Sequence, residues 1–389
     1  MYIKYILRTY LFLLMMGGLS QKNAHASCKT LDLIPQNNKT IISGKVTDKD
    51  GNGLEFASVF IANTTFGTIT NEEGAYSLEN IPFGSHMMVV SYIGYQFIKV
   101  TIHLDKPKYY QNFQLKKLDV ELSEIEVTAQ KSKNNWKNNY KKFEENFIGT
   151  SKNSNQCKII NPQHLRFHYD RKEKVLRAQS NEMLIIENKA LGYKILYLLE
   201  NFELKKDGSF KYMGSANFEM LEASTAEIEK LWLVKRKEAY YGSIKHFLRS
   251  LYMNKLTEEG YFVISTNAML PLKSYNELQK KLDPYKEPVG KELILLPGNY
   301  FFERKISFAN YLYVVYTKES EEYYFIGTIN PEYKSIPFQQ SWIQLARNPS
   351  DFNILGYYNN PTEVIVYGNW ASEKLAESLP KDYLPEKNN

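Results

Sequence analysis

The sequence predicts two folded parts: an all-β sandwich near the N-terminus and, behind it, an α+β domain with a large antiparallel sheet. Between residues 41 and 97, short strands are separated by turn clusters such as Asp48-Lys49-Asp50-Gly51-Asn52-Gly53, a rhythm typical of a sandwich. From residue 165 onward, strands again alternate with turns, and one helical stretch interrupts them. The chain has 389 residues, which is enough for two or three domains with separate cores.

Residues 1–26 have the features of a secretory signal peptide. Lys4 and Arg8 supply the charged start, and the apolar run Tyr10–Leu19 is too short to span a bilayer comfortably. Ala24-His25-Ala26 then fits an A-x-A cleavage site. We therefore expect an exported protein that works in the periplasm or at the outer membrane or cell surface.

Cleavage at this site would start the mature chain at Ser27, and the polar residues 27–40 would form a flexible tail. A lipoprotein signal is the alternative, in which Cys28 carries the lipid, although His25 stands where such signals usually have leucine. The chain has two cysteines. In an oxidising compartment, Cys28 and Cys157 would either form a disulfide or remain separate thiols.

Charge gives no support for binding to nucleic acid. The full chain has a formal net charge of +6, and loss of a basic signal peptide would leave it only mildly basic. Lysine and arginine alternate with glutamate along the chain, and the densest basic group, Lys235-Arg236-Lys237, is short. These residues are explained by a solvated helix face.

Several short motifs are spaced through the predicted sandwich, which spans residues 41–115. They are Gly44-Lys45-Val46-Thr47-Asp48, Gly53, Ala57-Ser58-Val59, Gly67-Thr68, Thr70-Asn71-Glu72-Glu73-Gly74-Ala75-Tyr76-Ser77-Leu78, Pro82-Phe83-Gly84 and Ser91-Tyr92-Ile93-Gly94-Tyr95. Together they resemble the carboxypeptidase-regulatory-like domain, a transthyretin-like Greek-key sandwich found on exported proteins of Bacteroidetes-type bacteria. The resemblance implies an accessory domain of a cell-envelope protein, not a catalytic module.

Residues 116–134 are predicted to form a linker. Within it, the octet Leu122–Ala129 is similar to the segment that follows this sandwich in TonB-dependent outer-membrane receptors. The rest of the chain is too short for the plug and barrel of such a receptor. The similarity therefore applies to the front half alone.

An amphipathic helix opens the second domain, which spans residues 135–389. Between residues 135 and 148, aromatic residues recur at helical spacing: Trp136, Tyr140, Phe143 and Phe147. Such a stripe more often packs into a core than binds a ligand. We expect it to cover a sheet.

Strands are predicted on both sides of a second helical stretch. The first group comprises Leu165–Tyr169, Val175–Gln179, Met183–Glu187, Tyr193–Leu204 and Phe210–Leu221. The second group comprises Tyr261–Ser265, Glu292–Leu296, Tyr300–Phe308, Tyr311–Thr317, Tyr323–Thr328 and Glu363–Tyr367. Between them, Ser224 and Glu227 form a capping box at the start of a helix, and a last helix is predicted over Trp370–Leu379.

The end of the chain carries a second, less specific similarity. Tyr367-Gly368-Asn369-Trp370-Ala371-Ser372-Glu373-Lys374-Leu375-Ala376 and Leu379-Pro380-Lys381-Asp382-Tyr383 resemble the uncharacterised C-terminal region behind such sandwiches in exported Bacteroidetes proteins. That resemblance implies no activity.

The chain contains no common catalytic signature. No histidine is followed by glutamate in the H-x-x-E pattern of zinc carboxypeptidases, and H-E-x-x-H, G-x-S-x-G and Walker motifs are absent. The acidic turn Asp48–Gly53 resembles the start of a calcium loop, but the twelfth position of such a loop is Val59 and not a carboxylate. We therefore predict a protein that is not an enzyme and that holds no cofactor or metal.

The nearest approach to a site is His164-Leu165-Arg166-Phe167-His168-Tyr169-Asp170. The aromatic residues favour extended backbone, which would separate His164 and His168 by roughly 13 Å, too far to share a metal ion. His168 and Asp170 would lie on one strand face about 7 Å apart, and they are the candidates for an acid/base pair. A hydrogen-bonded sheet surface explains the same residues without catalysis.

Aromatic residues are abundant, with 30 tyrosines and 4 tryptophans. Adjacent pairs such as Tyr323-Tyr324 and Tyr357-Tyr358 would turn one ring outward on a strand. Exposed rings suit recognition of proteins or sugars, whereas strand propensity explains tyrosine without any ligand.

We predict a non-catalytic protein that binds or scaffolds a cell-envelope protein or glycan. It would associate with the membrane through that partner or through a lipidated Cys28. One alternative is a hydrolase with a site in the second domain, built on His168, Asp170 or other carboxylates. The other is a carbohydrate-binding protein with co-planar aromatic rings on an exposed sheet.

Overall fold

The computed structural model describes residues 39–118, 133–180, 182–269, 294–320 and 338–386. The predicted signal peptide, the tail up to residue 38, most of the predicted linker and the predicted strand Tyr323–Thr328 lie outside these residues. Within the described ranges, no helix has the length and apolar character needed to cross a membrane.

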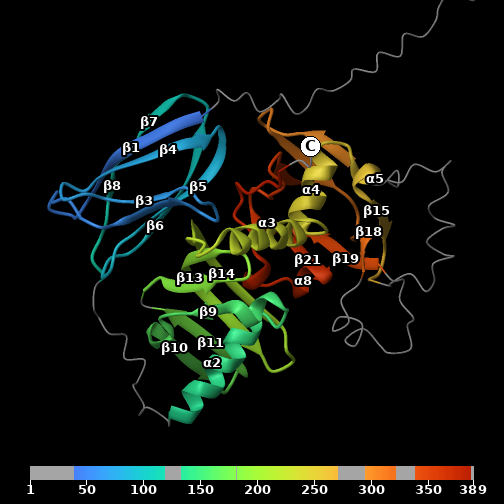
Figure 1. Ribbon diagram of the computed structural model, residues 1–389, viewed down its shortest axis with the longest axis horizontal. Helices are drawn as coiled ribbons and strands as arrows, with labels where there is room; N and C mark the ends of the chain where they lie inside the picture. Colours follow the sequence, from blue (N-terminus) through green and yellow to red (C-terminus); the bar gives the residue numbers. More distant parts are fainter. Residues whose placement is uncertain (1–38, 119–132, 181, 270–293, 321–337, 387–389) are drawn as a thin grey trace, which may run out of the picture. The chain divides into compact units, whose positions relative to one another are not determined.

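The N-terminal part is a sandwich of two sheets (Figure 1), as the sequence predicts. One sheet contains β1 (Lys39–Thr47), β4 (Ala75–Pro82), β7 (Lys108–Tyr110) and β8 (Phe113–Gln114). The other contains, in spatial order, β3 (Gly67–Ile69), β2 (Ser58–Ile61), β5 (Gly84–Ser91) and β6 (Ile98–Leu104). Along β1, alternate residues from Thr40 to Val46 are buried, because successive side chains of a strand face opposite sides.

A six-stranded antiparallel sheet follows, as the sequence predicts. It contains β9 (Cys157–Ile159), β10 (Leu165–Asp170), β11 (Val175–Ser180), β12 (Leu184–Asn188), β13 (Tyr193–Lys205) and β14 (Phe210–Met220). β14 pairs along β13, whose opposite edge is shared by β11 and β12. Two 3₁₀ turns, η1 (Asn153–Gln156) and η2 (Pro162–His164), precede β9 and β10.

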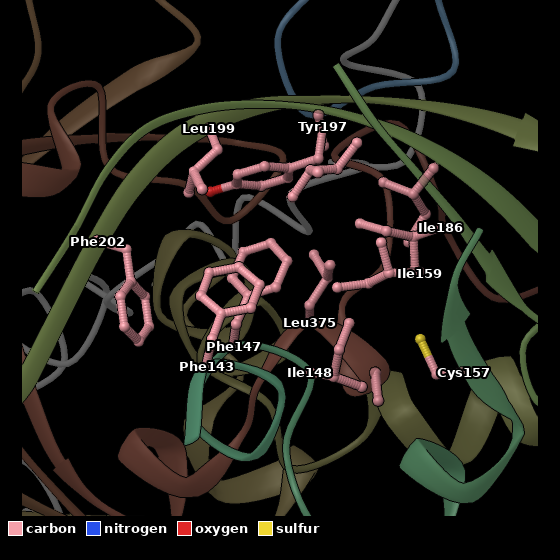
Figure 2. Packing of buried hydrophobic residues seen from close by; sticks show 14 of the residues in the cluster. Phe143, Phe147, Ile148, Cys157, Ile159, Ile186, Tyr197, Leu199, Phe202 and Leu375 are labelled. Atoms are coloured by element: carbon pink, nitrogen blue, oxygen red, sulfur yellow. The ribbon is translucent and has the colours of Figure 1, made fainter. Parts of the chain in front are cut away.

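The helix α2 (Lys133–Phe147) covers this sheet with its aromatic face, which confirms the amphipathic prediction. Figure 2 shows Phe143 and Phe147 pointing toward Phe202 and Tyr197 of β13. The ring centroids of Phe143 and Phe202 lie 4.7 Å apart, and those of Phe147 and Tyr197 lie 4.9 Å apart. Both are edge-to-face contacts, the geometry that aromatic quadrupoles favour.

Three helices then separate the first sheet from two smaller ones. They are α3 (Ala226–Tyr240), α4 (Ile244–Tyr252) and α5 (Leu256–Glu259). A four-stranded sheet has the order β15 (Tyr261–Thr266), β18 (Tyr311–Ser320), β19 (Phe338–Leu345) and β21 (Val364–Gly368). A three-stranded sheet has the order β16 (Ile294–Pro297), β17 (Glu303–Ser307) and β20 (Ser350–Asn353).

The later strands do not extend the first sheet, although the sequence patterns suggested one continuous sheet with a helical interruption. They have their own core, in which Phe247, Leu248 and Leu251 of α4 pack with Val263 and Val314. Because α4 presents a whole apolar face to β15 and β18, these strands bury their side chains against it instead of against α2.

Several element boundaries differ from the predicted ones. Thr225, and not Ser224, caps α3, and its side chain accepts a hydrogen bond from the backbone N–H of Ile228. The predicted last helix is broken into α8 (Asn369–Ser372) and the 3₁₀ turn η4 (Leu375–Glu377), because the backbone between them is extended. A further 3₁₀ turn, η3 (Pro361–Glu363), precedes β21.

One end of the sandwich is docked onto the C-terminal region. The loop after β2 lies beside β14: the backbone N–H of Asn63 donates to the carbonyl of Ala216, and that of Phe218 donates to the carbonyl of Thr64 at 2.9 Å. The backbone N–H of Lys381 also donates to the Asn63 carbonyl, at 2.7 Å. Main-chain pairing of this kind fixes the loop independently of its side chains.

Apolar contacts cover the sandwich surface next to this loop. Phe60, Ala62 and Val89 are buried, and Met183 and Leu198 of the C-terminal region pack against them. At the margin, Lys99 Nζ lies 2.7 Å from Glu200 Oε1. The sandwich and the C-terminal region therefore share a small core of their own.

Candidate functional site

The predicted acid/base candidates lie in the hairpin of β10 and β11. His168 is exposed and stands opposite Arg177. Asp170 accepts hydrogen bonds from the backbone N–H groups of Lys172 and Glu173, at 2.9 Å each, and lies 3.3 Å from the Arg177 guanidinium. The Glu173 amide is the largest of the contributions that lower the pKa of Asp170. These contacts give Asp170 a structural role in the hairpin turn.

His164 and Cys157 are likewise engaged in local structure. Strand β10 begins at Leu165, so extended backbone separates His164 from His168, and His164 Nδ1 lies 3.3 Å from Glu182 Oε1 instead. Cys157 is buried, and burial raises the pKa of its thiol to about 12. Cys28 lies outside the described residues, so its pairing with Cys157 stays a prediction.

The acidic turn of the sandwich uses its oxygens internally. Asp48 Oδ1 accepts from the backbone N–H groups of Asp50 and Asn52 at 2.9 Å, and Oδ2 accepts from the Asn52 side chain at 2.9 Å. Such an Asx turn stabilises the loop without an ion. Among the described residues, no three His, Cys, Asp or Glu side chains are grouped so that they could hold a metal.

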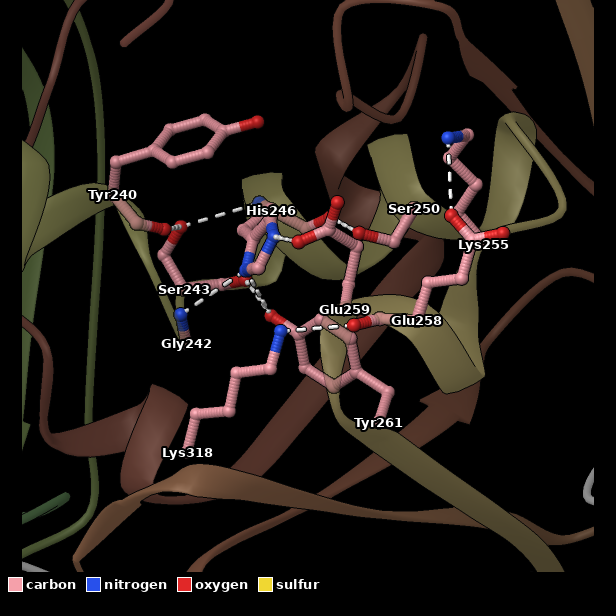
Figure 3. A network of polar contacts seen from close by, with 10 residues as sticks. All are labelled: Tyr240, Gly242, Ser243, His246, Ser250, Lys255, Glu258, Glu259, Tyr261 and Lys318. Carbon is pink, nitrogen blue, oxygen red and sulfur yellow. Dashed lines mark hydrogen bonds and ion pairs between the residues drawn. The ribbon is translucent and has the colours of Figure 1, made fainter. Parts of the chain in front are cut away.

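A buried polar network surrounds His246, at the start of α4 (Figure 3). Its Nδ1 accepts from the backbone N–H of Gly242 at 3.2 Å and from the Tyr261 hydroxyl at 2.9 Å. The proton is therefore on Nε2, which donates to Glu259 Oε2 at 3.2 Å. Burial lowers the pKa of His246 to about 4, so the ring is neutral near pH 7.

The network resembles part of a catalytic triad, but its groups satisfy one another. A triad histidine keeps one ring nitrogen for the nucleophile, whereas both nitrogens of His246 already have partners. The nearby Ser243 hydroxyl donates to the Tyr240 carbonyl at 2.6 Å and is equally engaged. We conclude that the network ties α4, α5 and β15 together.

A cleft of about 180 Å³ lies where the docked end of the sandwich meets the C-terminal region. In it, Ser85 Oγ lies 2.9 Å from His103 Nδ1 and 3.2 Å from Glu303 Oε1. Asn359 Nδ2 donates to the same Glu303 oxygen at 2.8 Å. A serine, a histidine and a carboxylate are thus brought together from segments far apart in the sequence.

Their order differs from that of a serine hydrolase. In such enzymes the histidine bridges the serine and the acid and takes the serine proton. Here the Ser85 hydroxyl is the bridge: it donates to Glu303, so His103 Nδ1 has to donate to it. His103 therefore cannot take a proton from Ser85 through this nitrogen, and the cleft is better suited to binding than to acyl transfer.

The end of the sandwich sheet opposite the docked loop exposes large apolar side chains. Ser58 at the start of β2 pairs with Ile69 at the end of β3 and with Ser91 at the end of β5, so these strand ends meet there. The exposed fractions of the four apolar residues at this end are 64% for Phe56, 57% for Ile69, 72% for Ile93 and 42% for Phe97. We call these four residues the sandwich tip.

Phe56 is also held in an unfavourable backbone conformation. Its φ is +61°, in the left-handed region that glycine adopts easily and that costs a residue with a side chain about 1–2 kcal/mol. The backbone N–H of Phe56 donates to the Thr70 carbonyl at 3.0 Å, which fixes the turn beside β3. Because the ring is largely exposed, core packing does not offset this cost.

Residues 42–127 match the family model of the CarboxypepD_reg-like domain. The match supports the resemblance seen in the sequence for the front part of the chain, and its first residue lies in β1. A search of the curated proteins finds no match to the sequence.

Similar solved structures include three proteins of different kinds. A mutant type II cohesin–X-dockerin complex from Acetivibrio cellulolyticus is 12% identical over 20% of this chain and 56% of that chain, with a TM-score of 0.18. Catechol 1,2-dioxygenase from Acinetobacter sp. ADP1 is 16% identical over 22% and 54%, with a TM-score of 0.19. BcpA, the major pilin subunit of Bacillus cereus, is 17% identical over 21% and 31%, with a TM-score of 0.18.

The chain thus spans between 31% and 56% of the length of these proteins. At such TM-scores the similarities carry no inference about function.

Sequence patterns did not indicate the His246 network or the cleft. His246 and Glu259 lie on different helices, and Ser85, His103 and Glu303 come from three different strands. Only a tertiary contact brings these groups together, so no spacing motif marks them. The sequence does not mark the sandwich tip either, because its residues have the pattern of ordinary strand ends.

Proposed function

We propose that the protein is an exported, non-catalytic binding protein of the cell envelope that holds a protein partner at its sandwich tip. The C-terminal region would serve as the support that anchors the other end of the sandwich. Export rests on the signal-peptide features of residues 1–26.

The single observation that carries the proposal is the contrast between the two ends of one sheet. The end at the Asn63 loop is docked by main-chain hydrogen bonds and by the Met183 and Leu198 contacts. The other end exposes the four apolar side chains of the tip. Grouped exposed apolar residues mark protein interaction sites more often than scattered ones do.

The backbone conformation of Phe56 also supports partner binding at the tip. A bulky residue kept at positive φ, with its ring in solvent, does not help the fold. Local strain of this kind is concentrated at functional positions. An aromatic ring presented by a rigid turn is also a favourable anchor for a protein partner.

The polar groups that could support catalysis favour the same interpretation. His246, Glu259 and Ser243 have their hydrogen-bonding groups engaged inside the protein, and Asp170 belongs to a turn. A partner-binding role needs none of these groups to be free.

The test is affinity purification of the tagged full-length protein from its native envelope under mild detergent, followed by mass spectrometry. Two tip variants, Phe56→Gly and Ile93→Ser, are compared with Lys174→Gly. Lys174 is an exposed residue at φ +57°, so this control makes the same change to the backbone far from the tip along the chain.

We expect one stoichiometric protein partner with the wild type and with Lys174→Gly, and its loss with both tip variants. Glycine suits the positive φ of residue 56, so Phe56→Gly is expected to fold with an unchanged thermal midpoint. A protein that purifies alone, or a partner that stays with both tip variants, would contradict the proposal.

A further inference from the structure

The cleft beside the docked end of the sandwich contains two charged groups that have no partner of opposite charge in the described part of the chain. Glu303, at the start of β17, is 2% exposed, and its carboxylate receives hydrogen bonds from Ser85 and Asn359, both uncharged. Among the described residues, no cation lies within ion-pair distance of it. A buried carboxylate without a cation is costly, even with hydrogen bonds from neutral groups.

Lys381 lines the same cleft and is half-buried. Its backbone is fixed by the bond to Asn63, and its Nζ lies 5.1 Å from the centre of the Tyr357 ring. Within the described part of the chain, this ammonium has neither a carboxylate at ion-pair distance nor a hydrogen-bond acceptor. Burial lowers the pKa of Lys381 to about 8, the effect expected when a cation lacks a counter-charge.

The cleft also has an unused polar group. The Tyr358 hydroxyl is buried and has no hydrogen-bond partner among the residues that the structure describes, although Tyr358 lines the cleft. Buried polar atoms in native proteins usually have a partner, so an unpaired one indicates a ligand or an ordered water. Tyr300 and Tyr357 also line the cleft.

We infer that this cleft binds a small zwitterion of the size of a free amino acid, with its carboxylate at Lys381 and its ammonium group at Glu303. Such a ligand carries both of the missing counter-charges. The cleft's volume of about 180 Å³ is close to that of a cavity that holds benzene, at about 150 Å³, so a ligand of that scale fits.

This inference goes beyond the proposed function and does not depend on it, because the cleft and the tip lie at opposite ends of the sandwich sheet. The two can fail separately: loss of partner binding at the tip would leave the cleft unaffected. The cleft needs the sandwich and the C-terminal region together, so it has to be tested in the full chain.

The test is isothermal titration calorimetry of the full-length protein with the common L-amino acids at millimolar concentration. For each amino acid that binds, two matched probes are titrated: its amide, which lacks the carboxylate, and its N-acetyl derivative, which lacks the ammonium group. The protein variants are Lys381→Met, Glu303→Gln and the control Lys137→Met, an exposed lysine on α2.

We expect Lys381→Met to weaken binding of the free amino acid about tenfold or more, and to leave the weak binding of its amide unchanged. Glu303→Gln should likewise weaken binding of the free amino acid about tenfold or more, and should leave binding of the N-acetyl derivative unchanged. The control should bind as the wild type does. Glu303→Gln keeps an oxygen that accepts the hydrogen bond from Asn359. If this variant nevertheless fails to fold, binding by Lys381→Met compared with the wild type tests the inference alone.

The inference is overturned if no free amino acid binds, if the blocked derivatives bind as tightly as the free amino acid, or if Lys381→Met binds as the wild type does.

Discussion

His246 is held in one tautomer by the groups around it. Two donors, the Gly242 amide and the Tyr261 hydroxyl, point at Nδ1, and the Glu259 carboxylate accepts from Nε2. Protonation of Nδ1 would break the hydrogen bond donated by the Gly242 amide and would reverse the one with the Tyr261 hydroxyl, whose proton would turn to the Ser243 carbonyl at 3.4 Å. The network therefore stabilises the fold only while the ring is neutral.

This arrangement predicts acid sensitivity. The pKa of His246 is about 4 in the folded protein and 6.5 for the ordinary side chain, so the unfolded chain binds a proton first as the pH falls. His246 contributes about 3 kcal/mol to the free energy of unfolding above pH 6.5. This contribution is lost progressively as the pH falls toward 4.

Denaturant unfolding of the wild type and His246→Gln across this window measures the effect. The variant should start less stable and should lose less stability on acidification than the wild type does. His86, whose pKa burial also lowers to about 4, remains in both proteins and serves as a common background. Parallel pH profiles for the two proteins would show that His246 is not the group involved.

Some features of single residues could be predicted from the sequence, and others could not. The Asp48 turn and the extended backbone at His164 and His168 follow from local chemistry, and the structure has both. His246 and Glu303 carry no local mark, because their partners come from other elements. Burial and partner choice, which decide the chemistry of a side chain, are tertiary properties.

At the level of elements, α3 is attached to the first sheet by a close contact with its backbone. Trp232 Nε1 donates to the Lys189 carbonyl at 2.7 Å, and the buried Arg236 donates to the carbonyls of Leu191 and Gly192 at 2.7 and 3.0 Å. The Arg236 guanidinium also lies 4.2 Å from the centre of the Tyr193 ring. Carbonyl groups in the turn just before β13 thus replace the carboxylate that a buried arginine usually needs.

Gly192 is the residue that makes this close contact possible. Its φ is +70°, and a Cβ there would lie 2.2 Å from the Trp232 ring. Gly208 has a similar φ of +85° but open space around it. We expect Gly192→Ala to lower the free energy of unfolding by at least about 2 kcal/mol more than Gly208→Ala does, since only the former adds a steric clash.

Thermal or chemical denaturation of the two variants makes this comparison directly. Both variants carry the same backbone penalty for alanine at positive φ. The difference between their free energies of unfolding therefore measures the contact with Trp232. Equal losses of stability would show that α3 moves away from the sheet at little cost.

The sequence predicted whether a segment forms a helix or a strand better than it predicted which elements pack together. The alternation along β13 and the aromatic stripe of α2 have strong periods, and both elements form as predicted. Strand β19 escaped prediction because three polar residues, Gln339, Gln340 and Ser341, are buried within it. Its side chains are polar on both faces, so no period of two marks it as a strand.

At the level of the whole molecule, the sandwich is attached through its own backbone. The Asn63 loop bonds to Ala216 and Lys381, and side chains from both parts share a small core. One sheet of the sandwich is thereby fixed at one end and free at the other. This asymmetry leads to both proposals, a partner at the free end and a small ligand at the fixed end.

The division of the chain into a sandwich and a following α+β region could be expected from turn spacing and motif resemblance. The docking between them could not be, because its main-chain hydrogen bonds, its few apolar side chains and its Lys99–Glu200 ion pair have no distinctive spacing in the sequence. For the same reason, the sequence did not distinguish the covered end of the sandwich from the exposed one.

Site-specific photo-crosslinking in the native envelope tests the central claim most directly. A photoreactive amino acid would replace Ile93, the most exposed residue of the tip, and in a second protein Tyr169, which is 49% exposed on β10. We predict one discrete adduct from position 93 and none of that mass from position 169. No adduct at position 93, or the same adduct from both positions, would contradict a partner-binding tip.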